Sequence, residues 1–213
     1  MANFAPRCYN RGMSNEAVTG WARDADIRES LKSRLREDHA GEADVLLVEE
    51  MGLCQGEVRI DLGIINGQFI GYEIKSPRDT LERLPGQAEV YSRTLDQVTV
   101  VTCERHLAGV TELVPDWWGI EVVGSSESSV RFDRVREAQQ NPSVDPAALV
   151  QLLWRHEVLS ILIENRWDRG VRTKPKQVLW NRLVESVEPH ELHLIVRNGL
   201  KAREDWKVAQ PLA

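Results

Sequence analysis

Residues 59–75 read RIDLGIINGQFIGYEIK and have the pattern of a β-hairpin. Two runs of alternating apolar residues, 58–65 and 68–75, flank the dipeptide Asn66-Gly67, which favours a tight turn. We therefore predict two antiparallel strands joined by a short loop. The charged residues of both runs lie toward the open end of this hairpin, where they would come close together.

Two registers are possible for the hairpin. A two-residue turn would place Ile60 opposite Glu73 and Asp61 opposite Tyr72. A three-residue loop would place Asp61 opposite Glu73 and would make one face wholly apolar. That face would hold Ile60, Leu62, Ile64, Ile70, Tyr72 and Ile74. Burial favours the second register, because a slip of one residue moves every side chain to the opposite face.

The other face of this second register carries charged residues. Asp61 would face Glu73, and Arg59 would face Lys75. Two carboxylates so close destabilise each other unless a cation lies between them. Oxygen ligands suit Mg²⁺ or Mn²⁺. Lys75 follows Glu73 on the same face, where it could position a water molecule or stabilise charge on a phosphate.

A solvated strand face is the alternative interpretation, because charged residues are common on the exposed side of a half-buried strand. Gly63 and Gly71 fall on the charged face and leave room for the close approach of another backbone. The second strand also leads, after a short turn, into a helical segment. These features favour a functional site.

The rest of the chain predicts two parts. Residues 1–140 mix helix and strand patterns, and residues 141–213 form a small all-helical module, with a linker over 130–145. The predicted helices span 24–38, 79–95, 147–166, 174–187 and 189–203. Within 79–95, Pro85 either opens a second helix or kinks the first. The other predicted strands span 44–50, 98–102 and 117–123. The fold class is therefore α/β with a mixed sheet.

The composition limits location and partners. The chain shows no apolar run of membrane-spanning length and no signal-peptide pattern, so we expect a cytoplasmic protein with no membrane partner. The three cysteines lack the spacing of a zinc site. A net charge of -6 argues against tight binding to DNA, although residues 155–207 hold 11 Lys or Arg and 8 Asp or Glu.

Asp61, followed after eleven residues by Glu73-Ile74-Lys75, resembles the signature of the PD-(D/E)XK nuclease superfamily. The run from residue 59 to Tyr91 is similar to a family of largely uncharacterised bacterial and phage-associated proteins, and the resemblance covers roughly residues 20–123. It implies a restriction-endonuclease-like αβββαβ core. The leading proline of the signature is replaced by Ile60.

This resemblance implies a metal-dependent nuclease that cleaves DNA, with RNA not excluded. Asp61 and Glu73 would bind Mg²⁺ or Mn²⁺, and Lys75 would serve the hydrolytic water. Gln87 and Tyr91 resemble the Q-x-x-x-Y motif of an exonuclease branch linked to recombination helicases. Their spacing places both on one helical face, where they would support the active site or contact DNA.

Further site residues are predicted around these five. Glu50 is the preferred third metal ligand, and the alternatives are Glu49, Glu29 and Glu37. Arg59, Arg78 and Arg83 are the predicted nucleic-acid contacts. His106 fits a polar loop better than a phosphate contact. The basic stretch from Arg166 to Lys176 is either a solvated loop or a contact for a phosphate backbone.

Two functions outside catalysis stay open at this point. The nuclease fold could serve as a weakly active or inactive binding or regulatory module of a mobile element or defence system, which the acidic charge favours. The chain could also be a helical interaction protein with an N-terminal scaffold. In either case the C-terminal helices could mediate a homodimer or bind a partner protein.

Overall fold

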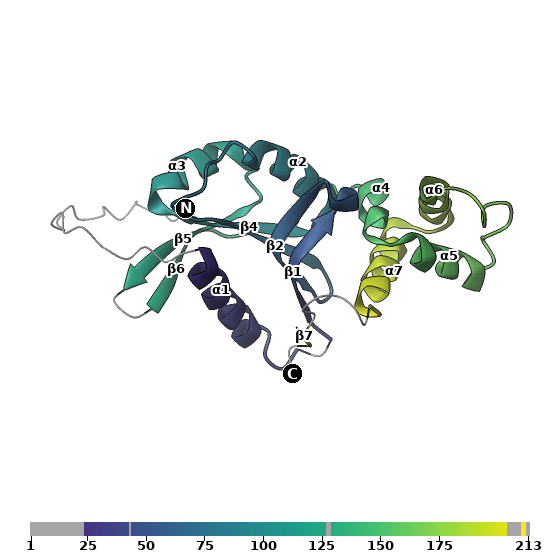
Figure 1. Ribbon diagram of the computed structural model, residues 1–213, viewed down its shortest axis with the longest axis horizontal. Coiled ribbons are helices and arrows are strands. Elements are labelled where there is room, and N and C mark those ends of the chain that lie inside the picture. Colours follow the sequence, from purple (N-terminus) through teal and green to yellow (C-terminus); the bar gives the residue numbers. More distant parts are fainter. Residues whose placement is uncertain (1–23, 43, 127–128, 204–209, 212–213) are drawn as a thin grey trace, which may run out of the picture.

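The computed structural model describes residues 24–203, 210 and 211, apart from residues 43, 127 and 128. A mixed sheet with three helices forms the larger part, and a group of helices follows it (Figure 1). The larger part comprises α1 (Asp24–Asp38), β1 (Leu46–Leu53), the 3-10 turn η1 (Cys54–Gly56), β2 (Val58–Ile65), β3 (Phe69–Lys75), α2 (Leu84–Thr94), β4 (Gln97–Cys103), α3 (Glu104–Leu113), β5 (Gly119–Ser126), β6 (Ser129–Arg136) and β7 (Gln210–Pro211). The helical part comprises α4 (Pro146–Leu149), the 3-10 turn η2 (Val150–Leu152), α5 (Arg155–Glu164), α6 (Lys176–Ser186) and α7 (Pro189–Lys201).

The sheet has the strand order β6-β5-β4-β3-β2-β1-β7. Strands β3, β4 and β5 are parallel neighbours, and the other pairs are antiparallel, so the predicted mixed sheet is confirmed. Parallel neighbours require crossover connections, which α2 and α3 provide. Both helices cover one face of the sheet, and α1 covers the other (Figure 1).

Apolar residues form a core on each face of the sheet. Ile27, Leu31 and Leu35, the predicted stripe of α1, pack on one face. The core under α2 and α3 continues into the helical part, where it includes Leu149 and Leu153. No single helix in the described segments has the length and apolar character needed to cross a membrane. The segments Pro146–Leu152 and Arg155–Glu164 reach that length and composition only when taken together, and they are bent by 106° relative to each other.

The predicted three-residue loop of the hairpin is confirmed. Leu62 pairs with Tyr72 and Ile65 pairs with Phe69. The Asn66 side chain accepts hydrogen bonds from the backbone N–H groups of the next two residues, at 2.6 and 3.0 Å. This Asx turn fixes the loop, and the loop fixes the register.

The hairpin face differs from the prediction at Ile60, which packs in the core under α2, whereas Leu62 packs in the core under α1. The alternation reverses between them. Here Glu50, on the neighbouring strand, adopts a left-handed φ of 49°. The β2–β3 ladder ends at Leu62, so Asp61 does not pair with Glu73 as predicted. An alternation of apolar and polar residues with a period of two cannot predict such a local irregularity in two neighbouring strands.

The glycines of the charged face also have a role other than the predicted one. An added Cβ at Gly71 would lie 2.6 Å from Leu95 Cδ1 and 3.1 Å from Ile60 Cγ1, and one at Gly63 would lie 3.2 Å from Met51 Cε. Core side chains therefore occupy the space beside both glycines. The glycines allow these side chains to pack closely, rather than leaving room for the approach of another backbone.

One predicted helix is interrupted, and another begins where its proline lies. The predicted helix 147–166 breaks after η2, because Leu153 and Trp154 are extended, with ψ of 136° and 159°. Apolar spacing continued across the break at Leu153 and concealed it. Of the two alternatives for residues 79–95, the one in which Pro85 opens a helix is confirmed, because α2 begins at Leu84 with Pro85 in its first turn. The missing N–H of proline costs no hydrogen bond at that position.

Two further elements were missed in the sequence. Strand β6 lies in the predicted linker 130–145, and its residues Val130 and Phe132 pack against the core under α1. Helix α3 follows β4 directly and buries His106 and Val110, so His106 is not a loop residue. Alternation in the first case and a spacing of three to four in the second were the available signals.

Replacement of Gly71 by alanine is expected to destabilise the protein, because the new methyl group overlaps buried Leu95 and Ile60 side chains. Overpacking of this kind costs about 1–3 kcal/mol. Urea denaturation measures the loss. Gly67→Ala is the matched control, since nothing lies within 4 Å of an added Cβ there. Equal stability of the two variants would contradict the packing described.

Candidate active site

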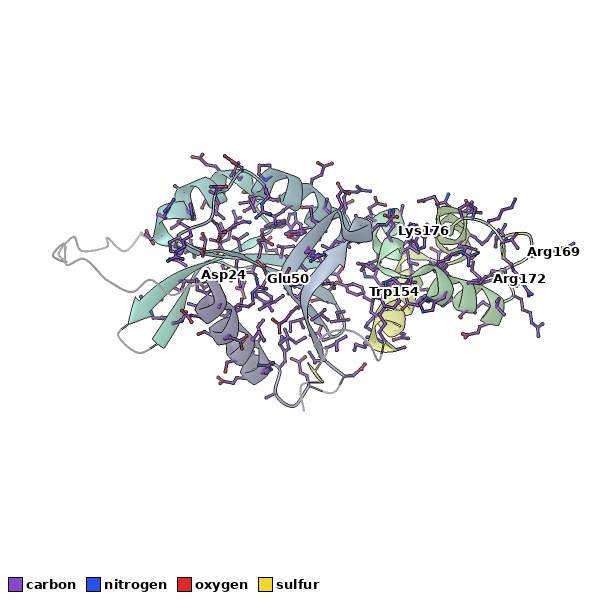
Figure 2. All side chains as sticks on the ribbon, viewed as in Figure 1. Asp24, Glu50, Trp154, Arg169, Arg172 and Lys176 are labelled. Atoms are coloured by element: carbon purple, nitrogen blue, oxygen red, sulfur yellow. The ribbon has the colours of Figure 1, made fainter. Side chains whose placement is uncertain are left out.

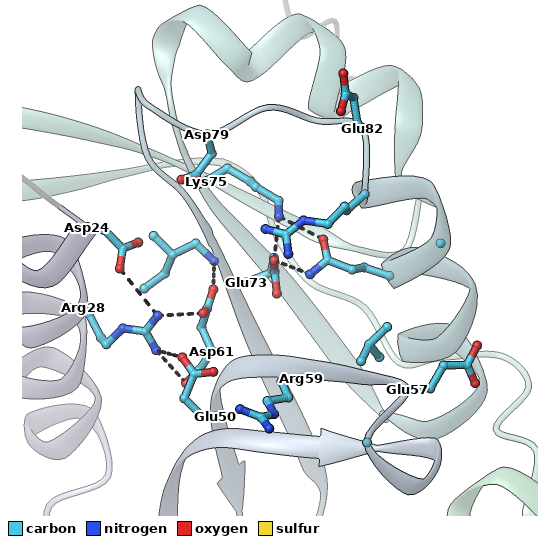
Figure 3. Close-up of a pocket in the computed structure, with 16 residues that line it drawn as sticks. Asp24, Arg28, Glu50, Glu57, Arg59, Asp61, Glu73, Lys75, Asp79 and Glu82 are labelled. Carbon is cyan, nitrogen blue, oxygen red and sulfur yellow. Dashed lines mark hydrogen bonds and ion pairs between the residues drawn. The ribbon is translucent and has the colours of Figure 1, made fainter.

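A pocket of about 760 Å³ opens where α1, β1, β2 and β3 approach the first turn of α2 (Figure 3). Its acidic lining residues are Asp24, Glu50, Glu57, Asp61, Glu73, Asp79 and Glu82, and its basic ones are Arg28, Arg59, Lys75 and Arg83. Carboxylates outnumber cations, so the pocket favours a positively charged ligand. Asp24, Arg28, Asp79 and Glu82 were not predicted to belong to a site.

The Glu73 carboxylate is the centre of a hydrogen-bond network. Its Oε1 accepts from Lys75 Nζ and from Gln87 Nε2, both at 2.7 Å. Its Oε2 accepts from the Tyr91 hydroxyl at 2.7 Å. Glu73 is 3% exposed and Lys75 is 4% exposed. Both charges are therefore held in place by neighbours rather than by solvent.

Helix α2 presents Gln87 and Tyr91 to this carboxylate from successive turns. The Gln87 amide bridges the pair, because its Oε1 also accepts from Lys75 Nζ at 2.9 Å. The Tyr91 hydroxyl lies 2.6 Å from the backbone oxygen of Arg59, which ties α2 to β2. The structure thus brings together four of the predicted catalytic residues, Glu73, Lys75, Gln87 and Tyr91.

Burial sets the proton affinity of the network. Burial and the nearby Asp61 carboxylate raise the pKa of Glu73, against the opposing effect of Lys75. Burial, followed by the charge of Glu73, also raises the pKa of Tyr91, so its hydroxyl keeps its proton and acts as a donor. The negative charge of Asp61 thus disfavours the charged form of Glu73.

Asp61 is held by a different set of partners. Its Oδ2 accepts from the backbone N–H of Ile74 at 2.7 Å, where the β2–β3 ladder has ended. Its Oδ1 lies 2.7 Å from Arg28 Nη2. The same guanidinium lies 2.9 Å from Glu50 and 3.6 Å from Asp24 (Figure 3). Arg28 therefore offsets part of the negative charge on this side of the pocket.

Arg28 was not predicted as a site residue, because its contact with the site depends on the docking of α1 against the sheet. The available signal was a single basic residue next to Ile27, a member of the buried stripe. Burial alone would lower the pKa of Arg28, but the charge of Asp61 and the hydrogen bond that Arg28 donates to it raise the pKa above its ordinary value.

The donor set fits a metal ion that needs few protein ligands. The described residues hold no group of three or more His, Cys, Asp or Glu side chains that could bind a metal. Mg²⁺ is commonly bound by one or two carboxylates and several waters, and Asp61 with Glu73 matches that requirement. Glu50, the predicted third ligand, lies in the pocket but pairs with Arg28.

The remaining predicted residues divide between the pocket and other surfaces. Arg59 and Arg83 line the pocket and are exposed, whereas Arg78 is exposed and is not a lining residue. The alternative acids Glu49 and Glu29 both pair with Lys32 on α1. Neither these two acids nor Glu37 lines the pocket.

The fold and the pocket together define a mixed α/β protein with a site of carboxylates and a buried lysine at one side of its sheet. The chain belongs to the family described as Bacteriophage P4 protein cII, which it matches over residues 20–207.

Two known proteins resemble the chain. Protein cII of Enterobacteria phage P4 is 28% identical over 120 residues, which cover 56% of this chain and 46% of that relative. The chain thus spans about half the length of the relative. The solved structure of SPO1766, a protein of unknown function from Silicibacter pomeroyi, is 18% identical and covers 68% of this chain and 91% of its own, with a TM-score of 0.36. This likeness is too low to define the fold.

Removal of the Tyr91 hydroxyl is expected to lower the free energy of unfolding by about 1–2 kcal/mol, because buried hydrogen-bond partners lose a donor. Urea denaturation of Tyr91→Phe measures the change. Tyr72→Phe is the matched control, since the Tyr72 hydroxyl makes no hydrogen bond to the described residues. A Tyr91→Phe variant as stable as wild type would show that the hydroxyl does not tie α2 to the sheet.

Proposed function

We propose that this protein is a metal-dependent nuclease of the PD-(D/E)XK type, which hydrolyses phosphodiester bonds in DNA. One observation carries the proposal. Asp61, Glu73 and Lys75 line one pocket, and Gln87, from the helix after the E-x-K strand, is hydrogen-bonded to both Glu73 and Lys75. A solvated strand face would not bury a glutamate and a lysine together.

The order of elements supports a restriction-endonuclease-like core. Helix α1, the strands β1, β2 and β3, helix α2 and strand β4 follow one another in the order αβββαβ. The first three strands are antiparallel neighbours, and β4 lies parallel to β3. The E-x-K strand β3 thus lies inside the sheet, beside the crossover helix that carries the supporting residues.

Asp61 and Glu73 are the residues that would bind Mg²⁺ or Mn²⁺. A bound metal would polarise a phosphodiester and lower the pKa of a water molecule. Lys75 has three N–H donors, and two of them are used by Glu73 and Gln87. The third donor is available for the attacking water or a phosphate oxygen, and Gln87 fixes its direction.

Arg59 and Arg83 are the proposed phosphate contacts at this pocket, because both are exposed and line it. The acidic interior repels a phosphate unless a cation is bound, so substrate binding at the reacting centre depends on the metal. DNA is the proposed substrate, and an RNA strand of the same sequence provides the comparison in the test.

Loss of the Lys75 ammonium is expected to slow cleavage strongly. Labelled single- and double-stranded DNA is incubated with Mg²⁺ or Mn²⁺, and Lys75→Ala should cleave about 10²- to 10⁴-fold more slowly than wild type. Glu82→Gln is the matched control, since it removes a charge from the pocket rim without touching the network, and it should cleave normally. A folded wild type that binds metal but cleaves neither DNA nor RNA would favour the binding or regulatory module.

Arg28 competes with a metal ion for Asp61 and Glu50, so its removal is expected to tighten metal binding. Arg28→Gln should bind Mn²⁺ about tenfold more tightly than wild type, because one positive charge close to both carboxylates is lost. Isothermal titration calorimetry measures the affinity. Arg34→Gln is the control on the same helix, since Arg34 pairs with Glu121 outside the pocket. Weaker binding by Arg28→Gln would show instead that Arg28 positions Asp61.

A further inference from the structure

A second pocket lies in the helical part, and it adjoins the first. It encloses about 360 Å³ and is lined by η1, the α4–α5 connection and the start of α6. Gly56 lines both pockets, so the two meet at η1. Figure 2 shows Trp154 and Lys176 in the helical part, away from Asp24 and Glu50 of the first pocket.

Trp154 is an exposed aromatic side chain in a fixed position. It is 48% exposed. The Arg203 guanidinium lies 4.1 Å from its ring centroid, and the same guanidinium is bonded to Glu157 at 2.6 Å. The Trp154 backbone N–H donates to Glu157 at 2.6 Å, which caps α5. Arg203 lies over one face of the ring, and the His156 ring centroid lies 5.6 Å away, so the ring is held in place while about half of the residue stays exposed. This immobilisation reduces the entropy lost on binding.

The surface around this ring is basic. Residues 155–182 hold seven Lys or Arg and three Asp or Glu, although the whole chain has a net charge of -6. Among the described residues, Asp168 pairs with Arg172, and no carboxylate pairs with Arg169, Lys174 or Lys176. All four cations are exposed. The charges of Arg169, Lys174 and Lys176 are therefore available to a partner.

The connection between α5 and α6 is held in shape by Arg155. Its Nη2 donates to the backbone oxygen of Arg172 at 2.9 Å and to that of Lys174 at 3.2 Å. Lys176 lies over the Trp180 ring at 5.2 Å and lines the second pocket with Trp154. The cations thus extend outward from the pocket on an ordered segment (Figure 2).

We infer that this face binds a single strand of nucleic acid. Trp154 stacks on a base, and Lys176, Lys174 and Arg169 contact successive phosphates. An aromatic platform with neighbouring cations suits a single strand, because a duplex conceals the faces of its bases. The junction at Gly56 would direct the strand toward the carboxylate pocket. Binding here requires neither metal nor cleavage, so the inference is independent of the proposed nuclease.

The test measures binding of a fluorescent DNA strand by wild-type protein in EDTA, so that hydrolysis cannot intervene. A strand of about 20 nucleotides spans a typical binding surface. Anisotropy should show tighter binding of the single strand than of its duplex. Trp154→Ala should weaken binding about 5- to 150-fold, the loss expected for one stacked base. Trp154→Phe retains a stacking ring and should restore most of the affinity, which excludes misfolding as the cause.

The charge contribution is tested by a salt series. Combined replacement of Arg169, Lys174 and Lys176 by glutamine should reduce the slope of log K against log salt by about 2, because each phosphate contact on a single strand contributes about 0.7. Arg131→Gln, an exposed cation on β6 that pairs with Asp133, is the matched control and should leave the slope unchanged. Undetectable binding, equal affinity for the duplex, or an affinity unaffected by Trp154→Ala would overturn the inference.

Discussion

The buried carboxylate of Glu73 is the constraint on which the site depends. A charge removed from water is tolerated only where hydrogen bonds and a counter-charge replace its hydration. Lys75, Gln87 and Tyr91 supply these, and two of the three come from α2. The position of α2 relative to β3 is therefore fixed by the same contacts that shape the pocket. The network is assembled in the folded chain before any ligand arrives, which keeps the cost of reorganisation low.

The two carboxylates of the proposed metal site are neutralised by cations from different elements. Lys75 serves Glu73 from the same strand, and Arg28 serves Asp61 from α1. Two acids that repel each other are thereby kept stable without a metal. Lys75 is almost fully buried and also bonded to Gln87, whereas Arg28 shares its charge among three acids. Arg28 is consequently the cation that a metal ion would displace more readily.

Local patterns in the sequence predicted local features correctly. They failed where contacts between residues far apart in the sequence determine the structure. The turn at Asn66 and the burial of one hairpin face were enough to predict the register, and a spacing of four was enough to place Gln87 and Tyr91 together. The reversal of Ile60 was not predictable, because Glu50 on the neighbouring strand takes part in it. Arg28 reaches the site only through the docking of α1, and its position next to the buried Ile27 does not by itself indicate which acids it contacts.

The helical part and the sheet share one hydrophobic core, although the sequence pattern changes at residue 141. Leu149 and Leu153 share a core with Val48 and Ile60, so the boundary in secondary structure is not a boundary in packing. An apolar pattern running through Leu153 suggested one long helix, but the chain breaks there and exposes Trp154. The shared core fixes the surface around Trp154 relative to the carboxylate pocket. A nucleic-acid strand bound at Trp154 would therefore have a fixed direction relative to that pocket. A rigid connection of this kind positions a substrate without a hinge.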